Sequence, residues 1–538
     1  MNIESFYKDV CINNYFLGKI SQIYRDNCVL QVENLSVLSC RNILNESLIP
    51  NTINCLVIID SVQGIFLGEV FQSKILSNEK NHSSLYKGID ETIYPEISID
   101  LIGVFNQSTS RFKLPEFMNV GMLDKVYFAN KNILHLYLDS IEVNNNSDET
   151  PLIFGDFLNY ENEQVKLRPS TLFDHHLLVV GTTNSGKSTS SLSILNQLDI
   201  QNKKMLIIDP SGEYEDAFQD QNGRIKKVKL GINAAISPSK ITMRQWAILF
   251  QTNENTQGAV LSDAIKSLQY QKKNHLDGCY IKENKMIISV KNNMSTLTNA
   301  DMDFDISLLP KQIEEESVAE SKDKKGTYIH DIFRSNANNY LFDKVSFALS
   351  RTKLKDFFTI NENNKDLITI FDTFLNEEHS SLYIDTSNLG TSDEVGGMII
   401  DLLCNHLLSA QSVKPFVLFI DEVHRYTHLF GSNENFFNGL INLAREGRKK
   451  GIFLFLTTQN PQDVSPILLG QIGTLLIHRL THFEEIKAIQ NHVDEYSLKS
   501  IKKLNQGEAI LASINLLSDI YIRINKCNRI QHNQTPKL

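Results

Sequence analysis

The chain has 538 residues, of which 41% are hydrophobic and 22% are charged, and its formal net charge is −10. This composition is typical of a soluble globular protein with several domains, and the acidic balance excludes a polycationic nucleic-acid coat. A groove or pore can still be locally basic, because salt screens a charge beyond about 10 Å. The seven cysteines form no CxxC pair, so we expect reduced thiols. Neither a signal peptide nor an apolar run of about 20 residues is evident, so we expect a cytoplasmic protein without a membrane anchor.

Residues 1–150 are predicted to form a small β-barrel followed by a linker. Between Tyr15 and Asp139, short β-branched and aromatic runs alternate with turn residues at a spacing of roughly ten residues, as in small barrels and sandwiches. The polar, Asn-rich segment Glu142–Pro151 then ends in a proline, which indicates a linker or an exposed loop.

From about His175 the pattern changes to that of an α/β domain. Short, continuously apolar runs alternate with helical patterns, which predicts a parallel sheet covered on both faces. Residues 151–214 and 381–538 form this predicted core, and the more polar residues 215–380 form a predicted helical insertion. The expected strands are 177–180, 205–208, 381–384, 416–420, 452–457 and 474–477.

A phosphate-binding loop follows the first of these strands. The segment Gly181–Ser188 matches GxxxxGK[ST] without a mismatch and precedes a potential helix, which is the context the motif requires. Lys187 is expected to reach the β- and γ-phosphates, and the Ser188 hydroxyl to ligate Mg²⁺. The predicted nucleotide-binding residues are Gly181, Thr182, Thr183, Asn184, Ser185, Gly186, Lys187, Ser188 and Thr189.

Two strand ends carry acids that could complete this site. The segment Asp209–Gly212 matches the DxxG pattern of GTPases, but only one helix separates it from the phosphate loop and no NKxD element is present. The segment Phe416–Ile420 is followed directly by Asp421 and Glu422. Asp421 is expected to support Mg²⁺ and Glu422 to polarise the attacking water, whereas the alternative is an exposed acidic turn.

Polar residues on the next strand and the helix before it suggest further roles. Gln459 follows the strand 452–457 and could sense the γ-phosphate, although a residue of a turn before Pro461 is the alternative. Arg448 and Arg445 end the preceding helical pattern. Either could reach a nucleotide on a neighbouring subunit as an arginine finger, with Arg448 favoured, or could simply complement the helix dipole.

Five segments occur together in a set order: GTTNSGKST, DPSGEY, FIDEVHRY, LAREGRKKG and TTQNPQDVS. In this respect the chain resembles the HerA-like ATPases of the HerA–FtsK superfamily, which are hexameric motors that move double-stranded DNA. The resemblance implies a RecA-like motor domain with a helical insertion, preceded by a HAS-type barrel. It implies ATP and Mg²⁺ as cofactors, a catalytic Glu422, and a place near the nucleotide for Glu213.

The sequence departs from the family pattern at two positions. His175 stands where relatives often carry arginine, and a mostly neutral histidine does not replace a permanent cation. Asn184 stands where glycine is common in the phosphate loop, and we expect little effect because asparagine tolerates left-handed backbone conformations.

Three functions fit the resemblance. The first is an ATP-driven translocase of double-stranded DNA, acting as a homo-hexameric ring with an effector on its N-terminal barrel, such as a nuclease or a NAD-consuming enzyme, in DNA end processing or anti-phage defence. The second is a regulatory ring that mainly assembles the effector, and the third is a conjugation or DNA-packaging ATPase. Candidate DNA contacts are the basic segments Gly223–Leu230 and Gln271–His275, for which an ordinary solvated face is the alternative.

Overall fold

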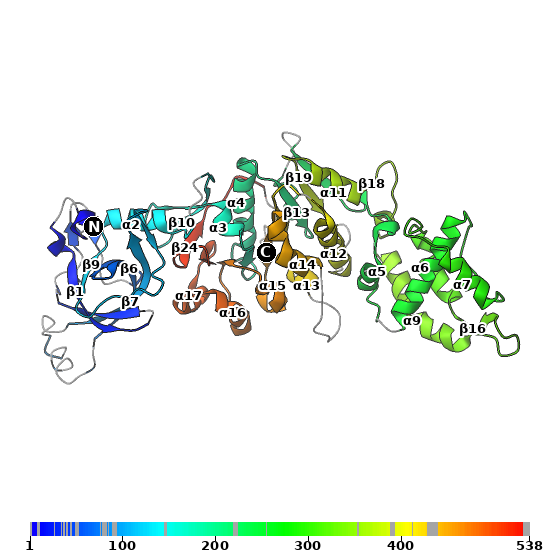
Figure 1. Ribbon diagram of the computed structural model, residues 1–538, viewed down its shortest axis with the longest axis horizontal. Coiled ribbons are helices and arrows are strands. Elements are labelled where there is room, and N and C mark those ends of the chain that lie inside the picture. Colours follow the sequence, from blue (N-terminus) through cyan, green and yellow to red (C-terminus); the bar gives the residue numbers. More distant parts are fainter. Residues whose placement is uncertain are drawn as a thin grey trace, which may run out of the picture. The chain divides into compact units, whose positions relative to one another are not determined.

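The structure is a computed structural model (Figure 1) that divides into two compact units. Unit 1 comprises Met1–Leu172, Ile489–Leu504 and Glu508–Arg523, and unit 2 comprises Phe173–Ala488, Asn505–Gly507 and Ile524–Leu538. The expected linker residues 145–147 lie outside the described part of the chain. The structure describes residues 3–7, 11–25, 27–33, 35, 38, 41–43, 46–48, 53–75, 77, 83, 86–88, 94–144, 148–218, 224–253, 256–351, 354–387, 393–411, 413–427 and 439–530.

Unit 1 contains the predicted N-terminal β-barrel. Six antiparallel strands follow one another in the order β2-β1-β9-β5-β6-β7, and pairing between β2 and β7 closes the barrel. Closure pairs the edge strands that an open sheet would leave exposed. The strands are β1 (Phe16–Ile23), β2 (Asn27–Val32), β5 (Leu56–Ser61), β6 (Gly64–Lys74), β7 (Glu96–Asn106) and β9 (Lys125–Phe128), with β8 (Arg111–Lys113) beside β7 and a separate hairpin of β3 (Arg41–Ile43) and β4 (Glu46–Leu48).

One part of the predicted all-β segment is helical. Helix α2 covers Lys131–Ser140, and the Asn130 side chain caps it by accepting a hydrogen bond from the Ile133 amide. Ile133 and Tyr137 are both buried, one turn apart, so the period of the apolar residues here is helical.

Unit 1 also holds an antiparallel group of strands in the order β11-β10-β24-β23. These are β10 (Leu152–Phe157), β11 (Gln164–Leu167), β23 (Glu508–Ser513) and β24 (Ile520–Ile524). Unit 1 also contains α17 (Glu495–Ser500) and most of α3 (Pro169–Phe173), whereas α16 (Phe483–Ile489) belongs almost entirely to unit 2.

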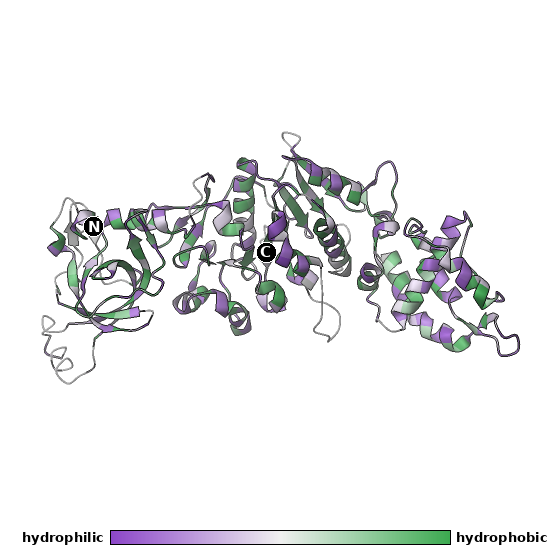
Figure 2. Ribbon diagram, viewed as in Figure 1, coloured by the Kyte–Doolittle hydropathy of each residue, from purple (hydrophilic) through white to green (hydrophobic). Residues whose placement is uncertain are grey.

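Unit 2 is built on a parallel sheet in the order β22-β12-β21-β20-β13-β19-β14. All six strands expected from the sequence are present, and hydrophobic residues fill them (Figure 2). In Figure 1, helices α4 and α12 flank β13. The bounds are β12 (Leu177–Val180), β13 (Met205–Asp209), β14 (Ile225–Lys229), β19 (Ser381–Asp385), β20 (Phe416–Ile420), β21 (Ile452–Thr458) and β22 (Thr474–Ile477), with α4 (Lys187–Ile200), α12 (Asp393–Ser409), α13 (His424–Thr427), α14 (Gly439–Glu446) and α15 (Pro466–Leu469).

Strand β14 lies within the segment predicted to be a helical insertion. It occupies the last position in the sheet order, beside β19, and only Ile225 and Val228 of its five residues are buried. A strand at an edge carries solvated and charged residues, so it lacks the continuous apolar run that marks the buried strands.

The rest of the insertion is mainly helical, as expected. Its aromatic core gathers around Trp246, which stacks on Phe250 and contacts Phe304 and Phe358. Across the described residues, no helix is both long enough and apolar enough to cross a membrane. The elements are α5 (Met243–Leu249), α6 (Gln257–Lys273), α7 (Ile287–Ser295), α8 (Leu309–Glu315), α9 (Ile332–Arg351), α10 (Leu354–Phe357) and α11 (Leu367–Asn376), with the strand pairs β16 (Val318–Glu320) with β17 (Tyr328–His330) and β15 (Ala234–Ala235) with β18 (Lys365–Asp366).

Candidate active site

The candidate site lies where the carboxyl ends of β12, β21, β20 and β13 meet. These strands are neighbours in the sheet and run parallel, and ligands bind at this edge in open α/β sheets. The phosphate loop follows β12, and the two candidate acids follow β20. The pocket at this edge is lined by Thr182, Thr183, Asn184, Gly186, Lys187, Ser188, Thr189, Ser211, Gly212, Glu213, Glu422, Gln459 and Gln506.

The phosphate loop requires its glycines. A Cβ on Gly181 would stand 2.5 Å from Ser185 Oγ and 2.7 Å from His478 Cβ, and Gly186 has a φ of +115°. Asn184 adopts the left-handed region, with a φ of 63°, as its tolerance for that conformation allows. Helix α4 then begins at Lys187 with no acid in its first turn, so its N-terminus favours an anion such as phosphate.

Asp421 is buried and does not itself line the pocket. Only 3% of it is exposed, and its carboxylate accepts a hydrogen bond from Thr457 Oγ1 at 2.5 Å. Burial raises the pKa of Asp421 to about 7, and the neighbouring Glu422 charge adds to the shift. A buried carboxylate with so high a pKa favours a proton or a cation beside it. Its oxygen and the hydroxyl of Ser188 are the hard ligands that suit Mg²⁺.

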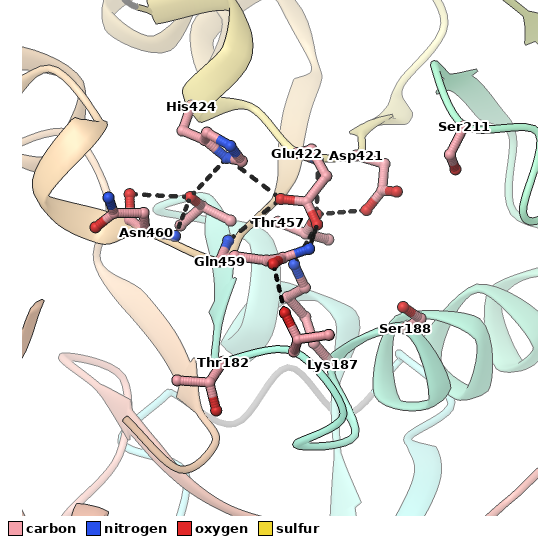
Figure 3. Close-up of polar contacts among 12 residues, drawn as sticks. Thr182, Lys187, Ser188, Ser211, Asp421, Glu422, His424, Thr457, Gln459 and Asn460 are labelled. Atoms are coloured by element: carbon pink, nitrogen blue, oxygen red, sulfur yellow. Dashed lines mark hydrogen bonds and ion pairs between the residues drawn. The ribbon is translucent and has the colours of Figure 1, made fainter. Parts of the chain in front are cut away.

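Glu422 is the centre of the polar contacts in the pocket (Figure 3). Its carboxylate forms an ion pair with Lys187 and accepts a hydrogen bond from Gln459 Nε2 at 2.7 Å. Although burial raises its pKa, the contacts with His424 and Lys187 outweigh burial and lower the pKa of Glu422 to about 2. The residue also has a left-handed backbone, with a φ of 49°, which costs about 1–3 kcal/mol and is common at functional sites.

Gln459 joins the phosphate loop to Glu422. Its Oε1 accepts a hydrogen bond from Thr183 Oγ1 at 2.9 Å while its Nε2 donates to Glu422. An amide in this place can donate to a γ-phosphate and accept from a water molecule. The structure therefore brings Lys187, Glu422 and Gln459 together, as the sequence prediction requires.

The acids after β13 have different surroundings. Glu213 lies in the pocket, where its carboxylate accepts a hydrogen bond from Ser188 Oγ at 3.4 Å; burial raises its pKa. Asp209 is fully buried and accepts hydrogen bonds from the amides of Gly212 and Tyr214 and from the Tyr383 hydroxyl. Asp209 thus holds the turn that presents Glu213. This internal role, like the absent NKxD element, argues against a GTPase DxxG site.

Arg445 and Arg448 are exposed and do not line the pocket. Arg448 donates a hydrogen bond to His175 Nε2 at 2.6 Å. Burial and the Arg448 charge both lower the pKa of His175, so a neutral imidazole accepts this bond. Position 175 therefore contacts the candidate finger arginine, a role that the sequence did not suggest.

Most lysines of the two basic segments are engaged within the chain. Lys229 pairs with Asp385 at 2.6 Å, Lys227 donates to the Glu215 carbonyl, and Lys273 pairs with Asp301 at 2.8 Å. Gly223 lies outside the described residues. These contacts favour the solvated-face interpretation of both segments over a dedicated DNA surface.

Sequence reasoning missed three groups at the site. Thr457 holds Asp421 and accepts a hydrogen bond from the Glu422 amide at 2.9 Å. Gln506, which lies just before β23, lines the pocket and donates to Asn184 Oδ1 at 2.8 Å. His424 Nδ1 lies 3.2 Å from Glu422 Oε2. Thr457 and His424 are close in sequence to the predicted site residues Gln459 and Glu422. Gln506 is not part of any of the five sequence segments on which the family resemblance rests.

A phosphate loop after β12, two acids after β20, and an amide after the strand between them, β21, define the class: a P-loop ATPase. The family model "Helicase HerA, central domain" matches residues 152–407, and "Helicase HerA-like C-terminal" matches residues 409–516. The chain therefore belongs to the HerA family, and it is an enzyme that hydrolyses ATP.

Two helicases and one solved structure are similar to this chain. The chain is 22% identical over 433 residues to a probable DNA double-strand break repair helicase HerA of Methanocaldococcus jannaschii, covering 72% of this chain and 78% of that protein. It is 24% identical over 370 residues to a DNA double-strand break repair helicase HerA of Sulfurisphaera tokodaii, covering 68% and 67%. A solved structure of the bacterial conjugative coupling protein TrwBdeltaN70 is also similar, with 16% identity, coverage of 69% and 90%, and a TM-score of 0.46.

The raised pKa of Asp421 predicts a stability effect that depends on pH. Its pKa is 3.8 in the unfolded chain and about 7 in the folded one, so the protonated form stabilises the fold below pH 3.8 and this stability is lost as the pH rises to 7. The full difference corresponds to roughly 4 kcal/mol. Asp421→Asn keeps the acceptor for Thr457 and carries no charge.

We therefore expect Asp421→Asn to raise the apparent Tm of the nucleotide- and metal-free protein more at pH 8 than at pH 5. Thermal unfolding of both proteins at the two pH values measures this difference. An equal change at both pH values, or a lower Tm of the variant at pH 8, would contradict the assignment of the buried charge.

Proposed function

We propose that this protein is an ATP-driven translocase of double-stranded DNA that works as a homo-hexameric ring with an effector protein. The main support for the proposal is that neither candidate arginine finger lines the pocket of its own chain. Lys187, Glu422 and Gln459 share one pocket, whereas Arg445 and Arg448 are exposed and outside it. A ring would place an arginine of one subunit at the pocket of the next, and an arginine finger contributes about 10³–10⁵ in rate.

In the proposed reaction, Lys187 and the amides of the phosphate loop bind and orient the phosphates. Ser188 and Asp421 would hold Mg²⁺, which when bound would neutralise charge on the β- and γ-phosphate oxygens. Glu422 would orient the attacking water and accept its proton, and Gln459 would contact the γ-phosphate. Lys187 pairs with Glu422 in the structure, and phosphate binding to Lys187 would weaken this pair and raise the basicity of the carboxylate.

The relatives named as double-strand break repair helicases support DNA as the substrate. A ring motor contacts DNA mainly through phosphates, so we expect duplex DNA to stimulate ATP hydrolysis and salt to weaken the stimulation.

The effector would bind the N-terminal barrel. At one end of this barrel, Val62 and Phe117 are fully exposed and Leu123 is 69% exposed. The loops that carry them are joined by a hydrogen bond of 3.1 Å from the Asn119 amide to Gln63 Oε1. Apolar residues that are exposed together on neighbouring loops favour a protein-binding surface. This surface also supports the second candidate function, a regulatory ring in which effector assembly matters more than DNA movement.

Size-exclusion chromatography and electron microscopy, with and without the protein encoded by the adjoining gene, test the assembly. We expect a six-fold ring and a larger complex when the adjoining product is an effector. In the same preparations, duplex DNA should stimulate ATP hydrolysis at low salt. A stable monomer under all conditions would contradict both candidate functions.

A further inference from the structure

The two carboxylate oxygens of Glu422 have different kinds of partner. Oε1 contacts Lys187 Nζ and Gln459 Nε2, and both of these side chains line the nucleotide pocket. Oε2 contacts the backbone amide of Gln459 at 3.2 Å and His424 Nδ1 at 3.2 Å. His424 is not among the lining residues, and in Figure 3 it lies on the side of Glu422 opposite Asp421.

Because their partners differ, the two carboxylate oxygens of Glu422 are expected to respond differently when a nucleotide binds. Phosphate oxygens attract the ammonium of Lys187 and the amide of Gln459, so Oε1 loses its partners and becomes free to contact water. Oε2 keeps both of its partners, because a backbone amide and a side chain outside the pocket do not move to the phosphate.

We propose that His424 is a positioning residue that anchors Oε2 of Glu422 so that Oε1 faces the attacking water. The inference rests on the proposed catalytic role of Glu422. A carboxylate on a left-handed backbone, with a φ of 49°, would otherwise be held on this oxygen only by the Gln459 amide among the contacts described. Displacing a reacting group by about 1 Å can cost 10²-fold in rate.

The neighbouring contacts define the tautomer that this role needs. Thr458 Oγ1 lies 3.2 Å from His424 Nδ1, and the same hydroxyl donates to the Asn460 carbonyl at 3.1 Å. Because the hydroxyl proton is used there, Thr458 presents a lone pair to the imidazole. Nδ1 therefore carries a hydrogen, which it shares between Thr458 and Glu422.

Substitutions can separate the two ring nitrogens of His424. An asparagine side chain places its amide nitrogen near the position of Nδ1, whereas a glutamine side chain reaches the position of Nε2. We expect His424→Ala and His424→Gln to lower kcat for ATP hydrolysis roughly 10- to 100-fold with little change in KM, and His424→Asn to retain most of the wild-type kcat. Equilibrium binding of a fluorescent ADP analogue with Mg²⁺ verifies that each variant has a folded site.

His330→Asn is the matched control, because His330 is an exposed residue of β17 in the insertion; it should leave kcat and KM unchanged. A kcat within two-fold of wild type for His424→Ala would overturn the proposal. So would equal losses for the asparagine and glutamine variants in proteins that still bind nucleotide. An inactive Glu422→Gln variant together with a fully active His424→Ala variant would contradict only the anchoring role of His424. An active Glu422→Gln variant would contradict both the catalytic role of Glu422 and the anchoring role of His424.

Discussion

Glu422→Gln is expected to reduce ATP hydrolysis by about 10³-fold while nucleotide binding remains. General base catalysis contributes about 10²–10⁴ in rate, and glutamine keeps the size of the side chain but does not accept a proton from water. The substitution also removes the ion pair with Lys187, so the lysine becomes more available to phosphate and the affinity for nucleotide should not fall. Steady-state phosphate release and equilibrium nucleotide binding measure the two quantities.

Glu495→Gln is the matched control for this variant. Glu495 is an exposed residue of α17 that pairs only with Lys499 among the described contacts, and exposed ion pairs of this kind contribute little to stability. The control should hydrolyse ATP at the wild-type rate. If Glu422→Gln kept its activity within two-fold of that rate, the catalytic base would have to be another residue.

Arg448→Ala is expected to produce a loss of similar or larger size, about 10³-fold or more, because it removes the arginine finger. Arg448 is exposed, contacts His175 and stands outside the pocket of its own chain, so its effect should appear on the neighbouring subunit. Arg445→Ala provides the comparison, since Arg445 lies on the adjacent turn and is also exposed.

Mixed rings distinguish an arginine that acts between subunits from one that acts within its own chain. Arg448→Ala subunits have an intact pocket, and Glu422→Gln subunits have an intact arginine. Mixing the two inactive proteins should therefore restore part of the activity at the interfaces where the intact halves meet. No recovery in rings shown to contain both subunits would contradict the composite site, and a greater loss for Arg445→Ala would assign the finger to Arg445.

The sheet of unit 2 was predictable because its central strands are buried on both faces. Leu177–Val180 and Phe416–Ile420 are buried at every position, so they must be continuously apolar, and that pattern is visible in the sequence. Strand β14 was missed because its edge position allows lysines. Helix α2 was missed because its apolar residues follow a β-rich segment without a change in composition.

The residues of the candidate site that belong to sequence motifs could be predicted, whereas the contacts between them and their neighbours could not. Asp421, Glu422 and Gln459 follow the ends of apolar runs, and the phosphate loop that carries Lys187 follows another such run. Parallel pairing brings the ends of these runs together. The contacts of His424 and Gln506 depend on side-chain directions and on the left-handed backbone of Glu422. Those features arise from tertiary packing, and no local sequence pattern reports them.

The central claim is that this site powers movement along double-stranded DNA. Displacement of a third strand from a DNA triplex tests it most directly, because a motor that moves along the duplex removes that strand without separating the duplex. The wild-type protein should displace the third strand when ATP and Mg²⁺ are present, and Glu422→Gln should not. ATP hydrolysis by a wild-type ring that leaves the triplex intact would contradict translocation and favour the regulatory ring.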